Sequence, residues 1–361
     1  MNGDNLKTQK ILFISGSLNR GGAQRVMTLL ADEYVRLGWS VHMAVLLQNK
    51  IGYEISNQIV IHDVVRSGSQ IKNVLKWVKD IKNILINEKP SVVVSFAGRI
   101  NMITMLAARG TGIPVLVSER NDPVHDRRNK LEQWLCKRFY GKADKVVFQT
   151  RYQAQYYQKW CGNNSVVIGN PIGAPVYEGK HSKKDIICIG KLMDQKNHPM
   201  MIRAFKMIAD EFPDKQLYIY GEGAKRSELE NLVKEYGLEQ KVHLPGNSDR
   251  IFDIMHEYEY FVMCSDYEGL SNALLEAMVS GMICVSTAWN GVEDVVKDGE
   301  NGYLVPLGDS KALAEKLRNI LNVDNEKIRE FAIETGKKFS SDQVMTKWCG
   351  AIEGLVKRRK Q

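Results

Sequence analysis

The sequence lacks the paired cysteines that hold structural zinc or cross-link a small secreted domain. Its six cysteines stand singly, several of them inside apolar runs, at Cys136, Cys161, Cys188, Cys264, Cys284 and Cys349. A cysteine in such a run behaves as a small apolar residue. We therefore expect reduced thiols, and the cysteine spacing gives no reason to expect a structural zinc site.

Long apolar segments are also missing. Residues 1–10 are polar and contain neither the apolar core nor the cleavage-like site of a signal peptide. No later run approaches the roughly 20 apolar residues that a membrane-spanning helix needs. These absences predict a cytoplasmic protein.

The chain carries more positive than negative charge. Its 50 lysine and arginine residues exceed its 42 aspartates and glutamates, which gives a formal net charge of +8. The excess indicates an acidic partner, and charge alone leaves nucleic acid, anionic lipid and a phosphorylated ligand open. Because the sequence has no nucleic-acid-binding motif, nucleic acid is not expected as a partner.

The first half of the chain alternates apolar runs with amphipathic segments. Residues 10–15 predict a strand, 23–37 a helix and 40–47 a second strand, which together make a βαβ unit. Further strands are predicted at 60–65, 91–96, 115–119 and 145–149, and further helices at 70–87 and 101–109. This order is typical of an open, doubly wound parallel sheet.

The alternation lapses over residues 166–177, where glycine and proline concentrate, and this stretch predicts an interdomain linker. Strands are predicted again at 185–190, 216–220, 242–244, 260–264, 283–286 and 302–305. Helices are predicted between and after them, at 199–211, 227–236, 249–256, 272–278 and 310–321. The second half therefore predicts another parallel α/β domain.

With 361 residues, the chain is long for a single core. The predicted domains are 1–172 and 173–340, followed by a C-terminal helix at 341–361 that packs back on the first domain. The expected fold class is α/β, with two Rossmann-like doubly wound domains facing a central cleft. Ligands of open sheets bind at the carboxyl ends of the strands, so both domains would contribute to that cleft.

Residues 264–278 place two carboxylates on either side of a helix start. Ser271 stands where it would cap the helix, with Glu268 in the loop before it and Glu276 on the second turn. The backbone amides of residues 269–272 lie between the two glutamates. Unpaired amides at the positive end of a helix suit an anion such as a diphosphate. The alternative is that both glutamates are solvated surface residues.

Three other loops follow predicted strands or open a helix. Lys191 and Lys196 in the loop at 190–197 would offset the charge that builds on a leaving diphosphate, unless both are simply solvated. Gly221 and Gly223 allow close backbone approach to a ligand. Amides of the glycine pair at 21–22, at a helix start, would meet a phosphate or an acceptor.

The motifs of the second half resemble family 4 of the retaining glycosyltransferases, which have the GT-B fold. The resemblance is carried by the two glutamates eight positions apart followed by AMVSG, by GKLMDQKN, by IYGEGAKRSELENLVKEYGLEQKVHLPG and by GVEDVVKDGENGYLVPLGD. It is dense over residues 185–309. The first half is matched more loosely, chiefly by its first strand, the GGAQRV loop and SERNDP.

The resemblance implies a role for individual residues. Glu276 would hold the ribose of a UDP-sugar donor, Glu268 its hexose near the reacting carbon, and the backbone around Leu244 the base. Lys191 and Lys196 would bind the diphosphate and share the catalytic role with Glu268. The remaining donor-binding residues implied are Gly22, Gly190, Gly269, Leu270, Ser271 and Asn272. Such enzymes need no metal and no cofactor, and the absence of a DxD motif between strand ends of the first half agrees with that expectation.

Two departures from the family pattern concern the diphosphate and the hexose. Lys191 stands where relatives usually carry arginine, and a lysine offers a point charge rather than a bidentate fork. In the stretch 118–122, where many members have a histidine, this chain has Arg120. The residues expected on the acceptor or hexose side are Gly21, Arg120 and Asn121. His125, which lies close to them in the sequence, is expected to be a surface residue.

Basic and aromatic residues gather after that stretch. They are Arg127, Arg128, Lys130, Trp134, Leu135, Lys137, Arg138, Phe139, Tyr140, Lys142 and Lys145. With the lysine-rich segment around Trp77, they would suit an anionic membrane or a lipid-diphosphate acceptor. The alternative is an ordinary solvated helix face over core aromatics.

The expected function is transfer of a hexose or N-acetylhexosamine from a UDP-sugar to a glycan linked to a lipid diphosphate, in surface polysaccharide synthesis. The resemblance implies that the domain 1–172 is on the acceptor side and the domain 173–340 on the nucleotide-sugar side. The enzyme would work peripherally at the inner face of the cell membrane. Three alternatives stay open: a GT-B sugar-nucleotide epimerase, a soluble transferase resembling glycogen synthase, and a non-catalytic protein that binds nucleotide sugars.

Overall fold

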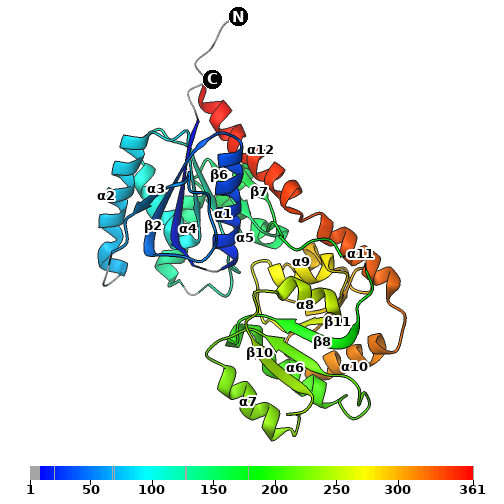
Figure 1. The fold of residues 1–361 in the computed structure, drawn as a ribbon. Coiled ribbons are helices and arrows are strands. Elements are labelled where there is room, and N and C mark those ends of the chain that lie inside the picture. The colour runs from blue at the N-terminus through cyan, green and yellow to red at the C-terminus, as the bar shows by residue number, and fades with distance from the viewer. Residues whose placement is uncertain are drawn as a thin grey trace, which may run out of the picture. The chain divides into compact units, whose positions relative to one another are not determined.

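The computed structural model describes residues 9–360 apart from 20, 67, 69, 127 and 178. The chain divides into two compact units, 1–171 with 342–361 and 172–341. Each unit is built on one parallel sheet with helices on both faces (Figure 1). Among the described residues, no helix combines the length and the apolar character needed to cross a bilayer.

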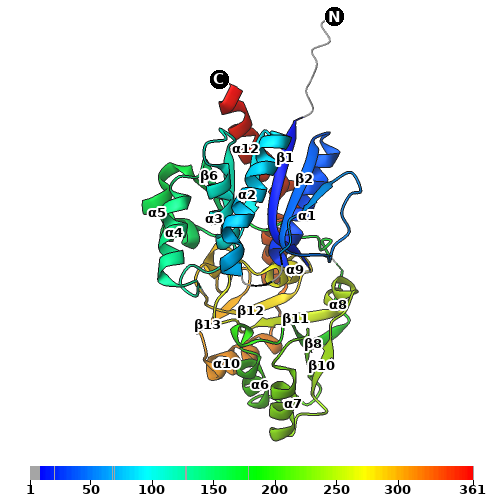
Figure 2. The ribbon, with the colours of Figure 1, turned by 90° about the vertical axis from the view of Figure 1, so that its left-hand side faces the viewer.

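The sheet of the first unit has seven parallel strands in the order β3-β2-β1-β4-β5-β6-β7. The strands are β1 Lys10–Leu18, β2 Ser40–Ile51, β3 Val60–Asp63, β4 Val92–Phe96, β5 Val115–Ser118, β6 Lys145–Phe148 and β7 Ser165–Val167. The helices are α1 Gly22–Arg36, α2 Gln70–Glu88, α3 Gly98–Ala108, α4 Lys130–Tyr140, α5 Arg151–Cys161 and α12 Ser341–Lys360. Figure 2 shows α2 lying across the strands β1 and β2 of this sheet.

The second unit repeats this architecture with six parallel strands in the order β10-β9-β8-β11-β12-β13. The strands are β8 Lys183–Ile189, β9 Leu217–Tyr220, β10 Val242–Gly246, β11 Tyr258–Met263, β12 Ile283–Thr287 and β13 Tyr303–Val305. The helices are α6 His198–Lys206, α7 Arg226–Glu235, α8 Ile251–Glu257, α9 Asn272–Val279, α10 Ser310–Leu321 and α11 Glu326–Lys337. The predicted fold class is confirmed as far as two doubly wound α/β units.

Successive residues of the central strands enter different cores, which is why these strands are apolar throughout. In β8, Ile186 and Cys188 pack in a core with α6, α7 and α10. Ile187 between them packs in a second core with α9 and Trp289. Both faces of the sheet are therefore buried, as expected for a doubly wound fold.

Four elements were not among those predicted from the sequence: helices α4, α5 and α11 and strand β7. β7 takes up residues 165–167, the beginning of the stretch predicted as linker, and pairs with β6. Helix α11 is an additional element that packs on α9 through Ala332. The change from the first unit to the second falls at residues 171–172.

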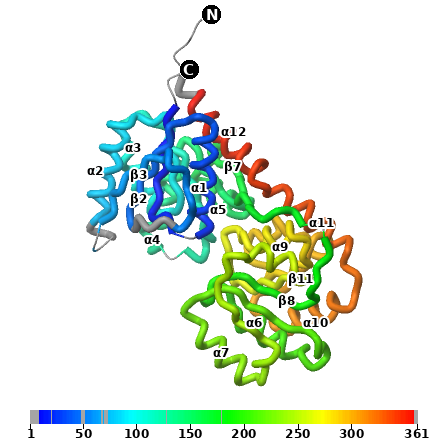
Figure 3. The backbone as a smooth tube through the Cα atoms, in the orientation of Figure 1, coloured from blue at the N-terminus to red at the C-terminus, as the bar shows by residue number. Residues whose placement is uncertain are grey.

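The C-terminal helix α12 returns to the first unit, which the backbone trace makes easy to follow (Figure 3). Its Trp348 is fully buried and lies 5.5 Å from the ring of Phe96, at the carboxyl end of β4. The guanidinium carbon of Arg120 lies 4.2 Å from the Phe96 centroid and 5.3 Å from that of Trp348. Stacked aromatic rings and a cation above them hold α12 against this sheet.

We predict that Trp348→Ala destabilises the first unit by about 3–5 kcal/mol, because it leaves a large cavity beneath α12. Trp134→Ala is the matched control, since that indole is 56% exposed and its loss should cost no more than about 0.5 kcal/mol. Urea unfolding followed by far-UV circular dichroism measures both. Equal midpoints for the two variants would contradict the role of Trp348.

Candidate functional site

Two loops meet at the carboxyl edge of the second sheet. β8 and β11 are neighbouring parallel strands, so the loops that follow them, at 190–197 and 264–271, emerge side by side. The amide of Asp266 donates to the carbonyl of Gln195 at 2.9 Å. The side-chain Nδ2 of Asn197 donates to the Asp266 carboxylate at 2.8 Å. The two loops are about 70 residues apart in the sequence, but these hydrogen bonds hold them together in the structure.

Lys196 and Glu268 form an ion pair across the joined loops. The Lys196 Nζ lies 2.5 Å from the Glu268 Oε1, and the two side chains are 18% and 10% exposed. The hydroxyl of Ser265 donates to the same oxygen at 2.7 Å. Charge-assisted hydrogen bonds of this kind are short and directional. A cation and a carboxylate, both with some access to solvent, are therefore fixed at one point of the strand edge.

Further hydrogen bonds fix the loop that carries Glu268. The Gln195 amide nitrogen donates to the Tyr267 carbonyl at 2.8 Å and lies 3.4 Å from the Glu268 Oε2. The Thr287 hydroxyl, at the end of β12, donates to the Ser265 carbonyl at 2.6 Å. Sequence reasoning singled out Lys196 and Glu268 but missed Gln195, Ser265 and Thr287. Their only signal was a polar side chain at or just beyond a strand end.

The predicted helix start after Glu268 is confirmed. Ser271 is the N-cap of α9, and its hydroxyl accepts from the amide of Leu274 at 3.4 Å. Leu270 anchors the loop in the core below. Glu276 lies on the second turn with only 7% of its surface exposed, whereas Gly269 and Asn272 are half-buried. In chain order the amides that begin α9 thus follow Glu268 and precede Glu276.

The glycines beside this edge serve the contact between loops. A Cβ on Gly221 would lie 1.9 Å from the carbonyl oxygen of Gly190, and one on Gly223 would lie 2.2 Å from that of Leu192. Gly221 also has a φ of +143°, which side chains disfavour. The sequence predicted that these glycines allow close approach to a ligand. In the structure they allow close approach to the backbone of the loop at 190–197.

Three other residues expected on the donor side lie in or directly after strands of the same sheet: Gly190 and Lys191 follow β8, and Leu244 is in β10. The side chain of Lys191 is exposed, and the Gly190 amide donates to the Tyr220 carbonyl at 3.0 Å. In β10, the Leu244 carbonyl accepts from the Arg226 Nη1 at 3.1 Å. Neither contact involves Lys196 or Glu268.

The candidate residues of the first unit occupy two places within it. Gly21 caps α1 and Gly22 begins it, and the Gly21 amide donates to the Tyr53 hydroxyl at 3.0 Å. Arg120 lies instead beneath α12, with its Nη1 donating to Asn170 at 2.8 Å. Burial lowers the pKa of Arg120 to about 9. A role for its guanidinium on the acceptor side requires that it leave the aromatic pair, so that role stays a prediction.

Glu119 organises the loop that carries Arg120 and Asn121. One of its oxygens accepts from the backbone amides of these two residues at 2.9 and 3.3 Å. The other accepts from the Arg128 Nη2 at 2.8 Å and the Tyr140 hydroxyl at 2.7 Å. Glu119 and its partners Arg128 and Tyr140 are buried, and sequence reasoning missed them because Glu119 and Arg128 are residue types usually found at the surface.

Known structures share this architecture. Sucrose-phosphate synthase from Thermosynechococcus elongatus superposes with a TM-score of 0.84 over 97% of this chain and 100% of that one, at 19% identity. HepE from Anabaena, solved in complex with UDP, gives 0.80 over 96% and 100%, at 16% identity. At such identities the likeness concerns the fold, which is that of the GT-B glycosyltransferases.

Family models then place the chain more closely. Residues 20–173 match Glycosyltransferase Family 4, and residues 175–339 match Glycosyl transferases group 1. The chain therefore belongs to the glycosyltransferases that combine these two domains, and the resemblance seen in the sequence is confirmed.

Two curated relatives come from Campylobacter jejuni. One is the N-acetylgalactosamine-N,N'-diacetylbacillosaminyl-diphospho-undecaprenol 4-alpha-N-acetylgalactosaminyltransferase, 29% identical over 89% of this chain and 92% of its own. The other, 24% identical over 95% and 98%, is the GalNAc-alpha-(1->4)-GalNAc-alpha-(1->3)-diNAcBac-PP-undecaprenol alpha-1,4-N-acetyl-D-galactosaminyltransferase. This chain spans nearly the whole length of both.

His198, which begins α6 directly after the loop at 190–197, titrates abnormally. The ring is 1% exposed, and burial followed by the charge of Lys196 lowers its pKa to about 4 from an ordinary 6.5. The folded protein thus holds His198 neutral where the unfolded chain would protonate it. Stability contributed by this group is present above pH 6.5 and is lost as pH falls toward 4.

We predict that wild type loses roughly 1 kcal/mol more stability than His198→Gln between pH 7.5 and 5.5, since only the unfolded wild type gains this proton. Urea unfolding at both pH values measures the difference. Met207→Leu, at a side chain that is 40% exposed and does not titrate, should keep the wild-type pH dependence. An equal loss in wild type and His198→Gln would show that His198 does not carry the effect.

Proposed function

We propose that this glycosyltransferase moves a hexose or N-acetylhexosamine from a UDP-sugar to a lipid-diphosphate-linked glycan, with retention of configuration and without a metal. The observation that carries the proposal is the Lys196–Glu268–Ser265 cluster beside the amides that begin α9. It offers a cation, a carboxylate and amide donors at the edge where open sheets bind ligands. HepE, which shares the fold, is described in complex with UDP-glucose, which supports a UDP-sugar as the donor.

Each donor-side residue has a proposed part. Lys196, with Lys191 beside it, offsets the charge on the diphosphate, and the amides of residues 269–271 bind its oxygens or the hexose. Glu268 holds the hexose near its reacting carbon. Glu276 orients the ribose, and the backbone at Leu244 contacts the base.

In the proposed step, the bond from the anomeric carbon to the diphosphate oxygen breaks and its electron pair stays with that oxygen. The acceptor hydroxyl oxygen bonds to the anomeric carbon from the same face, and its proton passes to the leaving oxygen. The charge that remains is the charge that Lys196 neutralises. The α linkages in the names of both Campylobacter relatives support retention, because UDP-hexoses such as UDP-glucose carry an α-linked diphosphate.

The same relatives support the acceptor class, since their names place the growing glycan on a diphosphate of undecaprenol. The chemistry to test is therefore a lipid-diphosphate glycan. Incubation with UDP-sugars and such an acceptor separates the alternatives. Transfer lengthens the glycan and releases UDP, an epimerase changes the sugar while conserving the UDP-sugar, and a binding protein does neither.

We predict that Glu268→Gln lowers the rate of transfer by at least about 100-fold, because the amide cannot pair with Lys196 or hold the hexose as the carboxylate does. Glycan extension with radiolabelled UDP-sugar measures the rate. The control is Glu257→Gln, which breaks an exposed ion pair to Lys183 in the same unit and should leave the rate unchanged. Near-wild-type turnover by Glu268→Gln would refute the assigned role.

We also propose that α4 touches an anionic membrane, which would bring the enzyme to a lipid-linked acceptor. Leu131 and Trp134 are 65% and 56% exposed and share a helix face with exposed Arg138. Arg128 does not contribute, because it is buried against Glu119 and Asp126, and Arg127 lies outside the described residues. Nor does Trp77, which is buried with its Nε1 donating to the Val64 carbonyl.

We predict that the double variant Leu131→Ala, Trp134→Ala binds liposomes containing anionic lipid at least about tenfold more weakly, because two apolar side chains no longer enter the bilayer surface. Flotation at moderate salt measures binding. Phe331→Ala, at a ring 45% exposed in the second unit, is the control. Failure of wild type to float would remove the membrane from the proposal and leave the donor chemistry untouched.

A further inference from the structure

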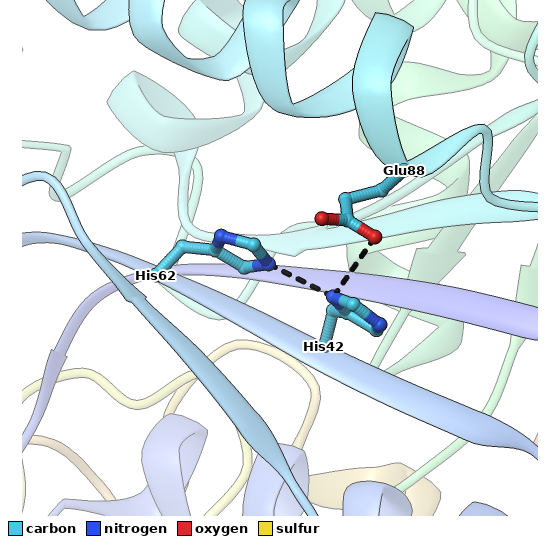
Figure 4. A group of neighbouring side chains, drawn as sticks. All are labelled: His42, His62 and Glu88. Carbon is cyan, nitrogen blue, oxygen red and sulfur yellow. Dashed lines mark hydrogen bonds and ion pairs between the residues drawn. The ribbon is translucent and has the colours of Figure 1, made fainter.

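A second polar cluster lies in the first unit, at the edge of the seven-stranded sheet where its strands begin. His42 is in β2, His62 is in the neighbouring edge strand β3, and Glu88 is the last residue of α2. The register pairs His42 with Val60 and Ala44 with His62, so both rings stand on the same face of the sheet. Figure 4 shows the three side chains pointing toward one another from these three elements.

The side chains are close enough to share one ion. The His42 Nδ1 lies 2.8 Å from the His62 Nε2 and 3.7 Å from the Glu88 Oε2. One ligand atom from each residue can be chosen so that all three lie within 4.8 Å of one another. Zinc bound at about 2.0–2.2 Å in tetrahedral geometry holds its ligand atoms roughly 3.4 Å apart. The nitrogen pair, now 2.8 Å apart, therefore needs to open by about 0.6 Å.

The protonation of the rings also suits a metal. A nitrogen–nitrogen contact of 2.8 Å has room for a single hydrogen, so one ring donates and the other presents a lone pair. The His42 Nε2 lies 3.2 Å from the Ser40 hydroxyl, which can fix the ring tautomer. Binding would need the shared hydrogen to move to the other nitrogen of its ring or to leave.

One neighbouring charge opposes a cation. The Lys10 Nζ lies 2.5 Å from the Glu88 Oε2, and its charge also lowers the pKa of both histidines. A carboxylate has two oxygens, however, so Lys10 can pair with Oε1 instead and leave Oε2, the oxygen 3.7 Å from the His42 Nδ1, to bind an ion. The Glu88 carboxylate is 27% exposed and the His42 ring 7%, which leaves an approach from solvent on the glutamate side.

We propose that His42, His62 and Glu88 bind a transition-metal dication of the Zn²⁺ class, separate from the residues proposed to bind the donor. Two imidazoles and a carboxylate form a known zinc ligand set, which leaves a fourth position for water. The ion would join three elements, and β3 has most to gain, because it is a four-residue edge strand paired only with β2. The site is thus a stabilising clamp, and it does not depend on the proposed function.

The test uses the full-length chain without a histidine tag, stripped with a chelator. Titration with Zn²⁺ against a chromogenic chelator should show one equivalent bound, and Co²⁺ should give the visible absorption of a four-coordinate site. His62→Ala and Glu88→Gln should weaken binding by at least about tenfold, the scale that even outer-shell partners reach. Zn²⁺ should raise the Tm of wild type and not of His62→Ala.

Two further variants sharpen the outcome. Lys10→Met should tighten Zn²⁺ binding, because it removes the competing ammonium, whereas a fortuitous surface site elsewhere would not respond. His125→Ala, at an exposed ring in the same unit, should bind as wild type does. Circular dichroism confirms that each variant is folded. Absence of stoichiometric binding by wild type, or equal affinity in wild type and His62→Ala, would overturn the proposal.

Discussion

Burial of both faces of each parallel sheet is the constraint on which the rest of the molecule depends. Neighbouring residues such as Ile186 and Ile187 enter opposite cores, so most positions along a central strand are apolar, and a polar one such as Ser95 is buried with a hydrogen-bond partner. Both clusters of charged and titratable side chains described above lie at the edges where strands begin or end. The Lys196–Glu268 pair lies at a carboxyl edge, and the cluster of His42, His62 and Glu88 lies at an amino edge.

This constraint explains why much of the fold could be predicted. Buried parallel strands appear in the sequence as uninterrupted apolar runs, and the run at 260–264 lies over β11 within one residue at its carboxyl end. β7 could not be predicted in this way, because it has three residues, none of them fully buried, and only its pairing with β6 makes it a strand. Helix α11 was not predicted from the sequence, because its contact with α9 depends on tertiary packing.

The candidate site could be predicted in part for a related reason. Lys196 and Glu268 stood out as charged residues just beyond apolar runs, and Ser271 as a cap. Gln195 and Ser265, which hold these side chains in place, did not stand out in the sequence. Their loops meet because β8 and β11 are neighbouring strands, although they lie far apart in the sequence. Arg120 shows the limit most clearly: its surroundings come from Phe96 in one strand and Trp348 near the end of the chain, which no local pattern joins.

The ion pair between Lys196 and Glu268 also bears on how the proposed donor would be held. An ammonium group has three N–H donors, and the 2.5 Å contact to Glu268 uses one of them. Lys196 can therefore keep its carboxylate while it binds a diphosphate oxygen, and Ser265 holds that carboxylate in place meanwhile. Glu268 still has its second oxygen, which makes only the long contact of 3.4 Å to Gln195 among the contacts described above, and in the proposed complex that oxygen would accept from a sugar hydroxyl. One charge pair could in this way connect the leaving group to the hexose without rearrangement of either loop.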